Sequence, residues 1–400
     1  MTKKAKKRIS ALLLSCLFLS VILTGSHGSL GMHALGTPTH RASTQVLAVP
    51  TALSGVTPVA FPSVRSHPSS LSASSAAGSG ITDYSGLRVH VGGMPFGVKF
   101  TTEGVLVVGF CDADGNRKPD APSFSAGLRL HDMIVKVNGE AVGDAETLSQ
   151  TVEQSGGKAL RITYVRDGKT YQTSLRPLRS RQDGKYKTGL LVRDSGAGIG
   201  TVTFILPESL AFGGLGHGIS DAETGQLIPI QRGSVVGVNI NGVVKGLVGT
   251  PGEVKGYFSS GKLGTLLCND ECGVFGVYAS LPQNASKQTT PIGLRSELKE
   301  GKAHILCTLN GTQAQQYEVE ISAINRNATG NKCFTVKVTD EDLLALSGGI
   351  VQGMSGSPII QNGKLVGAVT HVLINDPTTG YGIFIENMLN AAQKPMPRAS

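Results

Sequence analysis

The chain has 400 residues, of which 53 are glycine and 40% are hydrophobic, so it is long enough for two folded domains. Its net charge of +9 does not indicate nucleic-acid binding, because five of the basic residues crowd near the N-terminus and the others form no basic stripe. A composition rich in glycine, valine and threonine favours short strands and many turns. We therefore predict a mainly β protein with no nucleic-acid partner.

The first 25 residues have the pattern of an export signal. Basic residues between Lys3 and Arg8 precede an apolar run over residues 9–24, which is shorter than the ~20 residues that comfortably span a bilayer. Residues 1–25 are expected to be a signal peptide or a short N-terminal anchor, and both alternatives stay open because no clear cleavage site follows. Residues 26–84 are rich in Ser, Ala, Pro and Gly without periodicity, and are predicted to be a flexible tether.

A small α/β domain is predicted over residues 85–180. Its expected elements are two strands, a short amphipathic helix and a hairpin that turns at Asp167 and Gly168; they cover residues 104–110, 133–137, 145–153 and 160–175.

One stretch of this domain is specific. Residues 125–140 lead from small residues and a glycine through Asp132 and an apolar strand to an Asn-Gly turn, and this order resembles the signature of PDZ domains. The resemblance implies a domain that binds peptide ends. Its backbone loop for the ligand carboxylate would be formed by Phe96, Gly97 and Val98.

Residues 185–394 form the second predicted domain. Short stretches of strand composition alternate there with turn residues, and only residues 386–392 have a convincing helical pattern. The pattern predicts an all-β barrel or sandwich.

The most informative motif of this domain is the run Gly353-Met354-Ser355-Gly356-Ser357. A serine hydroxyl attacks a carbonyl when a base takes its proton and backbone N–H groups face the developing oxyanion. Flanking glycines allow such a turn, so we predict Ser355 as the nucleophile and the N–H groups of Gly353 and Ser355 as the oxyanion hole. A glycine-serine turn is also an ordinary hairpin loop, so the prediction requires a partner histidine.

His217 is the histidine best suited to be the base. It lies in a glycine-dense bend, residues 212–221, where backbone freedom lets an imidazole be aimed. His304 is expected to cap a strand, and His371 is expected to be a core histidine on an apolar strand. The other six histidines lie in the tether or the PDZ-like part.

The segments 216–221 (Gly-His-Gly-Ile-Ser-Asp) and 349–360 (Gly-Ile-Val-Gln-Gly-Met-Ser-Gly-Ser-Pro-Ile-Ile) lie behind an export signal and a PDZ-like part. This combination resembles the stage IV sporulation protein B peptidases of endospore-forming bacteria. The resemblance implies a trypsin-like double barrel and a serine endopeptidase without a cofactor. It also implies self-cleavage, and a cut in the extracytoplasmic part of a membrane complex that activates intramembrane processing of a late sigma factor. The implied place of action is the space between forespore and mother cell.

The aspartate that orients the histidine is not fixed by the sequence. The family pattern places it shortly before the serine turn, where Asp340 and Asp342 lie, and we favour Asp340 because it stands at the end of a predicted strand. A two-barrel topology suits Asp270 better, whereas Asp221 is too close in sequence to fold back easily onto the histidine. Position 354 carries Met where trypsin-like zymogens carry an Asp that pairs with a new N-terminus, so activation by that salt bridge is excluded.

No metal site is predicted. The pair Cys268 and Cys272 has no second close cysteine pair or His-x-x-x-His to complete a site. The alternative to a peptidase is a non-catalytic adaptor that binds peptide termini in the extracytoplasmic space. The two hypotheses differ in whether Ser355 is required.

Overall fold

The computed structural model describes residues 83–116, 121–222 and 225–393. The predicted export signal and residues 26–82 of the predicted tether lie outside the described residues, whereas Tyr84, the last residue assigned to the tether, is 4% exposed and donates from its hydroxyl to Asn390 at 2.8 Å. Within the described ranges, no helix has both the length and the apolar character needed to cross a membrane.

The first half of the molecule contains a ring of six antiparallel strands. Their order follows from the pairings, because β2 pairs on one side with β11 and on the other with β9 and so closes the sheet on itself. The ring consists of β2 (Pro95–Phe110), β9 (Leu190–Ile205), β10 (Ala211–Gly214), β13 (Gly273–Tyr278), β12 (Glu253–Asp270) and β11 (Ile230–Val244). Two further strands, β1 (Arg88–Val91) and β14 (Thr289–Pro291), extend it beside β9.

The second ring is a closed barrel of six strands with two helices. In spatial order its strands are β15 (Gly301–Cys307), β16 (Gln315–Ser322), β17 (Phe334–Val338), β20 (Asp376–Phe384), β19 (Lys364–Leu373) and β18 (Pro358–Gln361). The helix α4 (Glu341–Ser347) lies between β17 and β18, and α5 (Ile385–Ala392) follows β20. The predicted mainly β architecture with a double barrel is confirmed.

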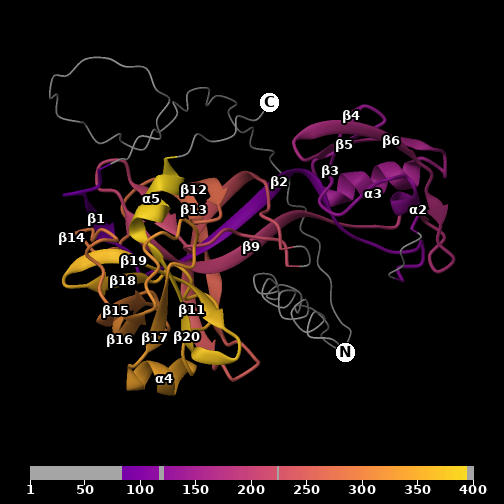
Figure 1. Cartoon of the computed structure of the whole chain (residues 1–400). Coiled ribbons are helices and arrows are strands. Elements are labelled where there is room, and N and C mark those ends of the chain that lie inside the picture. The colour runs from indigo at the N-terminus through magenta and orange to yellow at the C-terminus, as the bar shows by residue number, and fades with distance from the viewer. Residues whose placement is uncertain (1–82, 117–120, 223–224, 394–400) are drawn as a thin grey trace, which may run out of the picture.

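Two strands of the first ring extend beyond it and form part of the PDZ-like lobe. The far ends of β2 and β9 continue beyond the ring, and in Figure 1 they lead to this separate lobe. The lobe contains α2 (Pro122–Ser125), β3 (Met133–Val137), β4 (Glu140–Ala141), α3 (Ala145–Gln154), β5 (Leu160–Arg166), β6 (Lys169–Leu175), β7 (Leu178–Arg179) and β8 (Tyr186–Lys187). The predicted helix and the hairpin at Asp167 and Gly168 are confirmed.

The order of the domains along the chain differs from the expected one. From residue 83 on, the chain begins at the first ring, leaves it through β2, builds the PDZ-like lobe and returns through β9. The prediction that Phe96, Gly97 and Val98 form the peptide-binding loop of the lobe is wrong, because all three lie in the ring and pair with β11 and β9. Phe96 is 1% exposed and packs edge-on against Phe212 at 5.7 Å between ring centroids.

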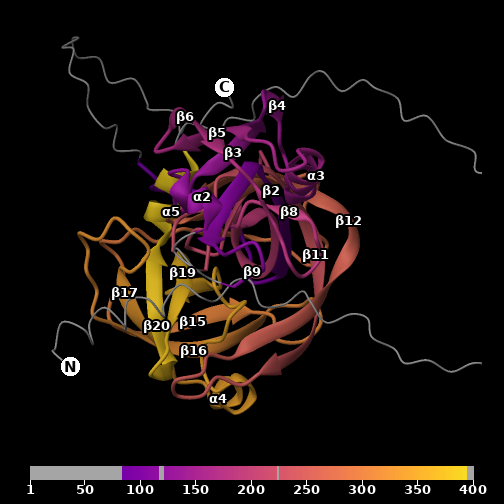
Figure 2. The same cartoon turned by 90° about the vertical axis from the view of Figure 1, so that its right-hand side faces the viewer.

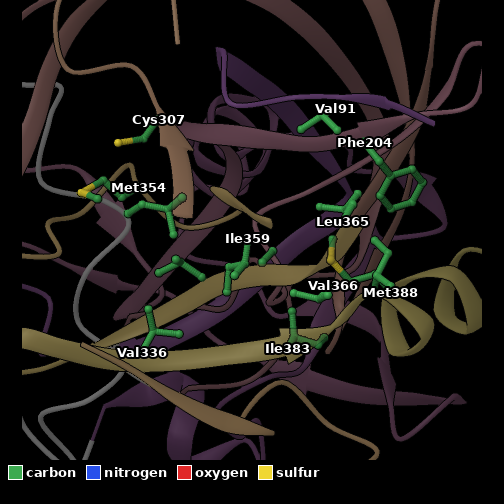
Figure 3. Close-up of a cluster of buried hydrophobic side chains, with 14 of the residues drawn as sticks. Val91, Phe204, Cys307, Val336, Met354, Ile359, Leu365, Val366, Ile383 and Met388 are labelled. Atoms are coloured by element: carbon green, nitrogen blue, oxygen red, sulfur yellow. The ribbon is translucent and has the colours of Figure 1, made fainter. Parts of the chain in front are cut away.

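Three apolar cores correspond to these parts. The largest joins the second ring to residues of the first, and Figure 3 shows Val91 and Phe204 in one cluster with Ile359 and Ile383. Met354, next to the predicted nucleophile, belongs to this cluster and is 1% exposed. The nucleophile turn is therefore fixed at one side by the main core of the protein.

In the lobe, the aspartate of the PDZ-like signature is a buried charge. The carboxylate of Asp132 has no exposed side-chain surface and accepts two bonds of 2.7 Å from Arg166, plus one of 2.7 Å from the N–H of Arg129. Two parallel donors from one guanidinium fit a carboxylate closely and compensate its loss of water.

Arg166→Met is expected to leave Asp132 buried without its counter-ion. Removing one partner of a buried pair is strongly destabilising, and because Arg166 is one fifth exposed we expect a loss of about 2–3 kcal/mol. Urea unfolding followed by tyrosine fluorescence measures it, since the chain has no tryptophan. The matched control is Arg161→Met at an exposed position of the same strand; equal losses in both variants would contradict this account.

Candidate active site

The serine run lies on a tight turn between α4 and β18. Gly353 and Gly356 have φ of 95° and 94°, values that favour glycine. A methyl group at Gly356 would collide with the Thr201 carbonyl oxygen and the Leu215 N–H, both from the first ring. The turn is thus pressed against the other barrel, and only glycine fits at the point of contact.

The N–H groups of Gly353 and Ser355 are the two predicted oxyanion donors. Each is oriented by a hydrogen bond that the carbonyl of the same peptide group accepts. In a planar trans peptide the C=O and N–H point in opposite directions. The carbonyl of Gln352 accepts from the Val254 N–H at 2.8 Å, so the N–H of Gly353 points away from Val254. The carbonyl of Met354 accepts from the N–H of Ser357 at 2.9 Å and from its Oγ at 2.6 Å, which directs the N–H of Ser355 away from Ser357.

Ser357 has a role that the sequence did not show. Its side chain is fully buried and donates to the Met354 carbonyl, so it supports the turn from behind and has no exposed surface with which to line a substrate site. Within the described residues, the N–H groups of Gly353 and Ser355 donate to no protein acceptor. Both donors are therefore available to an incoming oxygen.

His217 follows β10 in the first ring, after a bend at Leu215 and Gly216 with φ of 64° and 66°. Its Nδ1 lies 3.0 Å from the carbonyl oxygen of Gly218. A carbonyl can only accept, so this bond places the proton on Nδ1 and puts the lone pair of the neutral ring on Nε2. This is the tautomer that a general base needs.

The segments that carry the serine and the histidine meet between the two rings. The Oγ of Ser355 donates to the carbonyl of Thr370 at 2.7 Å, and a methyl group at Gly216 would lie 2.9 Å from the Thr370 side chain. The next residue, His371, lies with its ring centroid 4.7 Å from that of His217. In this state the serine proton is directed to Thr370, so catalysis requires Oγ to rotate towards the imidazole.

Both imidazoles of this pair are held neutral. Burial lowers the pKa of His217, against a smaller opposing effect of its bond to Gly218. Burial, the electrostatic effect of the neighbouring His217 and the charge of Lys332 lower the pKa of His371 to about 3. A positive charge on either ring would be poorly solvated here. His371, expected to be an ordinary core histidine, instead packs against the predicted base.

Asp340 and Asp342 have structural positions at the start of α4. Asp340 caps this helix: one carboxylate oxygen accepts from the Leu343 N–H at 3.0 Å and the other from the Glu318 N–H at 3.1 Å. Asp342 lies exposed in the first turn of α4. A sequence signal for the cap existed, because an aspartate followed by acidic residues and an apolar run is typical of a helix start.

Asp270 lies beside the histidine loop. The side chain of its neighbour Asn269 bonds both the N–H and the carbonyl of Ile219, at 2.7 and 2.8 Å. A methyl group at Gly218 would lie 2.7 Å from the carbonyl oxygen of Asp270. Asp221 faces elsewhere, because its buried carboxylate pairs with Arg193 at 2.5 Å.

Two six-stranded rings, with a serine turn from one and a histidine loop from the other meeting between them, define a serine peptidase of the trypsin-like class. The family model of SpoIVB peptidase S55 matches residues 184–389, just over half of the chain. The chain belongs to this family and is a serine endopeptidase.

Solved structures and a sequence relative are similar to parts of the chain. The active form of the Rv3671c protease of M. tuberculosis shares 15% identity, with 51% of this chain and 77% of that one covered and a TM-score of 0.30. The PDZ domain of an SdrC-like protein of Listeria monocytogenes shares 20% identity, covers 23% of this chain and 90% of that one, and has a TM-score of 0.20. A Lactococcus lactis protein named as a zinc metalloprotease is 31% identical over 20% of this chain; the match spans 18% of that protein's length.

Among the residues that the structure describes, no three His, Cys, Asp or Glu side chains lie close enough to hold a metal ion.

The pH dependence of serine reactivity tests the state of His217. A base must be neutral to accept the serine proton, and a lowered pKa means that His217 stays neutral below pH 6.5. The rate of labelling by a fluorophosphonate is expected to hold as pH falls past 6.5 and to decline only as pH passes through the lowered pKa. An acid limb with its midpoint at or above pH 6.5 would contradict the buried, neutral imidazole.

Proposed function

We propose that Ser355 is the nucleophile of this endopeptidase and His217 its general base, with the N–H groups of Gly353 and Ser355 as oxyanion donors. The observation that carries this proposal is the turn itself: each donor N–H is directed by an anchored carbonyl on the other side of its peptide. Donors fixed before substrate arrives stabilise a developing charge without reorganisation.

In the proposed reaction, Oγ of Ser355 leaves Thr370 and attacks the scissile carbonyl carbon while its proton passes to Nε2 of His217. The carbonyl oxygen becomes an oxyanion held by the two N–H groups. The imidazolium then gives the proton to the leaving amine, and an acyl-serine forms. Water, deprotonated by the same imidazole, hydrolyses this ester and restores the serine.

We propose Asp270 as the residue that orients His217. It is the last residue of β12, and its carbonyl oxygen would lie 2.7 Å from a methyl group added at Gly218, next to the histidine. Asp340, favoured by the family pattern, has both carboxylate oxygens engaged as a helix cap. An orienter must accept the Nδ1–H of the imidazole, which in this structure donates to the Gly218 carbonyl, so in the catalytic state Asp270 would have to replace that carbonyl.

The biological role that we propose is in sporulation signalling. Membership of the SpoIVB peptidase family supports it, together with the export pattern of the first 25 residues. The protein would cleave itself and the extracytoplasmic part of a membrane complex in the space between forespore and mother cell. That cut would activate intramembrane processing of a late sigma factor.

Peptide recognition by the lobe would use another segment than the expected one. The strand section 190–193 of β9 pairs with β2 along one edge, and α3 lies beside its start. A free strand edge next to a helix is the arrangement that adds a peptide as an extra strand. We propose this edge as the docking site for a peptide end.

Ser355→Ala is expected to abolish both self-shortening of the purified chain and labelling by a fluorophosphonate, because no other group supplies the attacking oxygen. N-terminal sequencing and mass spectrometry of the incubated protein measure the first, and gel fluorescence the second. Ser259→Ala, at an exposed position of β12, serves as the control and should behave as wild type. Wild-type protein that stays intact and unlabelled would favour the adaptor hypothesis.

Replacing each aspartate by Asn separates the candidates for the orienter. Asp270→Asn is expected to lower the labelling rate by about 10³–10⁴-fold, because the amide favours the wrong imidazole tautomer. Asp340→Asn should change it by less than about threefold, since Asn caps a helix nearly as well as Asp. The reverse ranking, with both variants folded by circular dichroism, would restore Asp340 as the orienter.

A further inference from the structure

The peptide group between Gln352 and Gly353 supplies one of the proposed oxyanion donors, and it is hydrogen-bonded to a strand of the first ring. The Val254 N–H donates to the Gln352 carbonyl at 2.8 Å, and the Gln352 N–H donates to the Gly252 carbonyl at 2.9 Å. Gln352 thereby forms a parallel bridge with Glu253 at the start of β12. The group that aims the Gly353 N–H is thus a backbone donor of the first ring.

The hairpin that supplies this donor is itself held in place. Its two strands, β11 and β12, form the long curved pair in Figure 2 that reaches towards α4. The Gly246 N–H donates to the carbonyl of Ser347 at 2.9 Å, and the Gly249 N–H donates to that of Ile374 at 2.8 Å. The neck of the hairpin is closed so tightly that a methyl group at Gly252 would collide with the Val244 carbonyl.

The side chain inside the turn, that of Met354, carries no charge and so cannot fix the Gln352–Gly353 peptide through an ion pair. Met354 is apolar and 1% exposed, and its sulfur accepts only a long contact of 3.4 Å from the Val351 N–H. The peptide between Gln352 and Gly353 would be free to turn over if the Gln352 carbonyl lost its partner, because glycine tolerates either orientation. A flipped peptide would present a carbonyl, rather than an N–H, to the oxyanion.

We propose that the β11–β12 hairpin is the positioning element of the oxyanion hole, and that it acts through the N–H of Val254. The inference rests on the proposed function of Ser355 and Gly353. It assigns to this hairpin the task that the ion pair between an aspartate and the newly cut N-terminus has when trypsin-like zymogens are activated. Val254 is a positioning residue: it touches neither substrate nor the reacting atoms, and its side chain is not the active part.

Val254→Pro tests the proposal because proline removes the N–H and keeps an extended backbone. Saturation kinetics of fluorophosphonate labelling separate the maximal labelling rate from the binding constant of the probe. Loss of one oxyanion donor lowers rates by about 10²–10³-fold, so we expect the maximal rate to fall by that factor with the binding constant unchanged. Val254→Ala keeps the N–H and is expected to stay within about threefold of wild type.

The results distinguish the two proposals. If wild type labels at Ser355 and Val254→Pro labels at the wild-type rate, or Val254→Ala falls as far as Val254→Pro, the hairpin proposal is overturned while the serine mechanism stands. If wild type does not label at all, the proposed function fails first.

If circular dichroism shows that the Val254→Pro protein does not fold, a second variant tests the same proposal. Gly252→Ala keeps every N–H but must displace the neck of the hairpin, and with it the carbonyl that accepts from Gln352. We expect its maximal labelling rate to fall about tenfold or more, with the binding constant of the probe unchanged. A wild-type maximal rate in a folded Gly252→Ala protein would overturn the proposal.

Discussion

The active site depends on the contact that Thr201 makes with the nucleophile turn. The Thr201 N–H donates to the carbonyl of Ser355 at 3.0 Å, and its Oγ1 donates to that of Gly353 at 2.8 Å. Its own carbonyl accepts from the Leu215 N–H at 3.2 Å, two residues before the histidine. One residue of β9 therefore connects the serine of the second ring with the histidine loop of the first, and its 3% exposure keeps these bonds away from water.

The same strand also joins the active site to the lobe. β9 begins in the PDZ-like sheet, passes the buried pair of Arg193 and Asp221, and ends in the first ring beyond Thr201. Paired strands resist stretching and bending along their whole length, because each displacement breaks several ladder bonds at once. The lobe is thus connected to the serine turn by one continuous strand, although its pairing with β2 changes register between Ser195 and Arg193.

Local signals in the sequence were sufficient for several elements. The periodicity of α3, the Asp-Gly turn of the hairpin and the glycine pattern around Ser355 each depend on neighbouring residues. The alternating apolar residues of β2 predict a strand but do not show which sheet it joins, and for this reason the sequence places Phe96 in the PDZ-like domain rather than in the first ring. The hydrogen-bond partners of Thr201 and Gln352 cannot be predicted from local sequence either. They lie about 150 and about 100 residues away along the chain, and only the closed rings bring them together.

The arrangement of the turn explains where the free-energy cost of the proposed oxyanion hole lies. A buried N–H without an acceptor costs about 1–3 kcal/mol, and this site keeps two of them free for a future oxygen. The half-buried positions of Gly353 and Ser355 lower that cost, because water can reach them before substrate does. Left-handed backbone at Gly353 and Gly356 adds little strain, since both are glycines.

Three anchored carbonyls, at Gln352, Gly353 and Met354, then keep the peptides from turning over to satisfy the free donors. Rigidity in this site thus comes from acceptors on the far side of the turn, which substrate never touches.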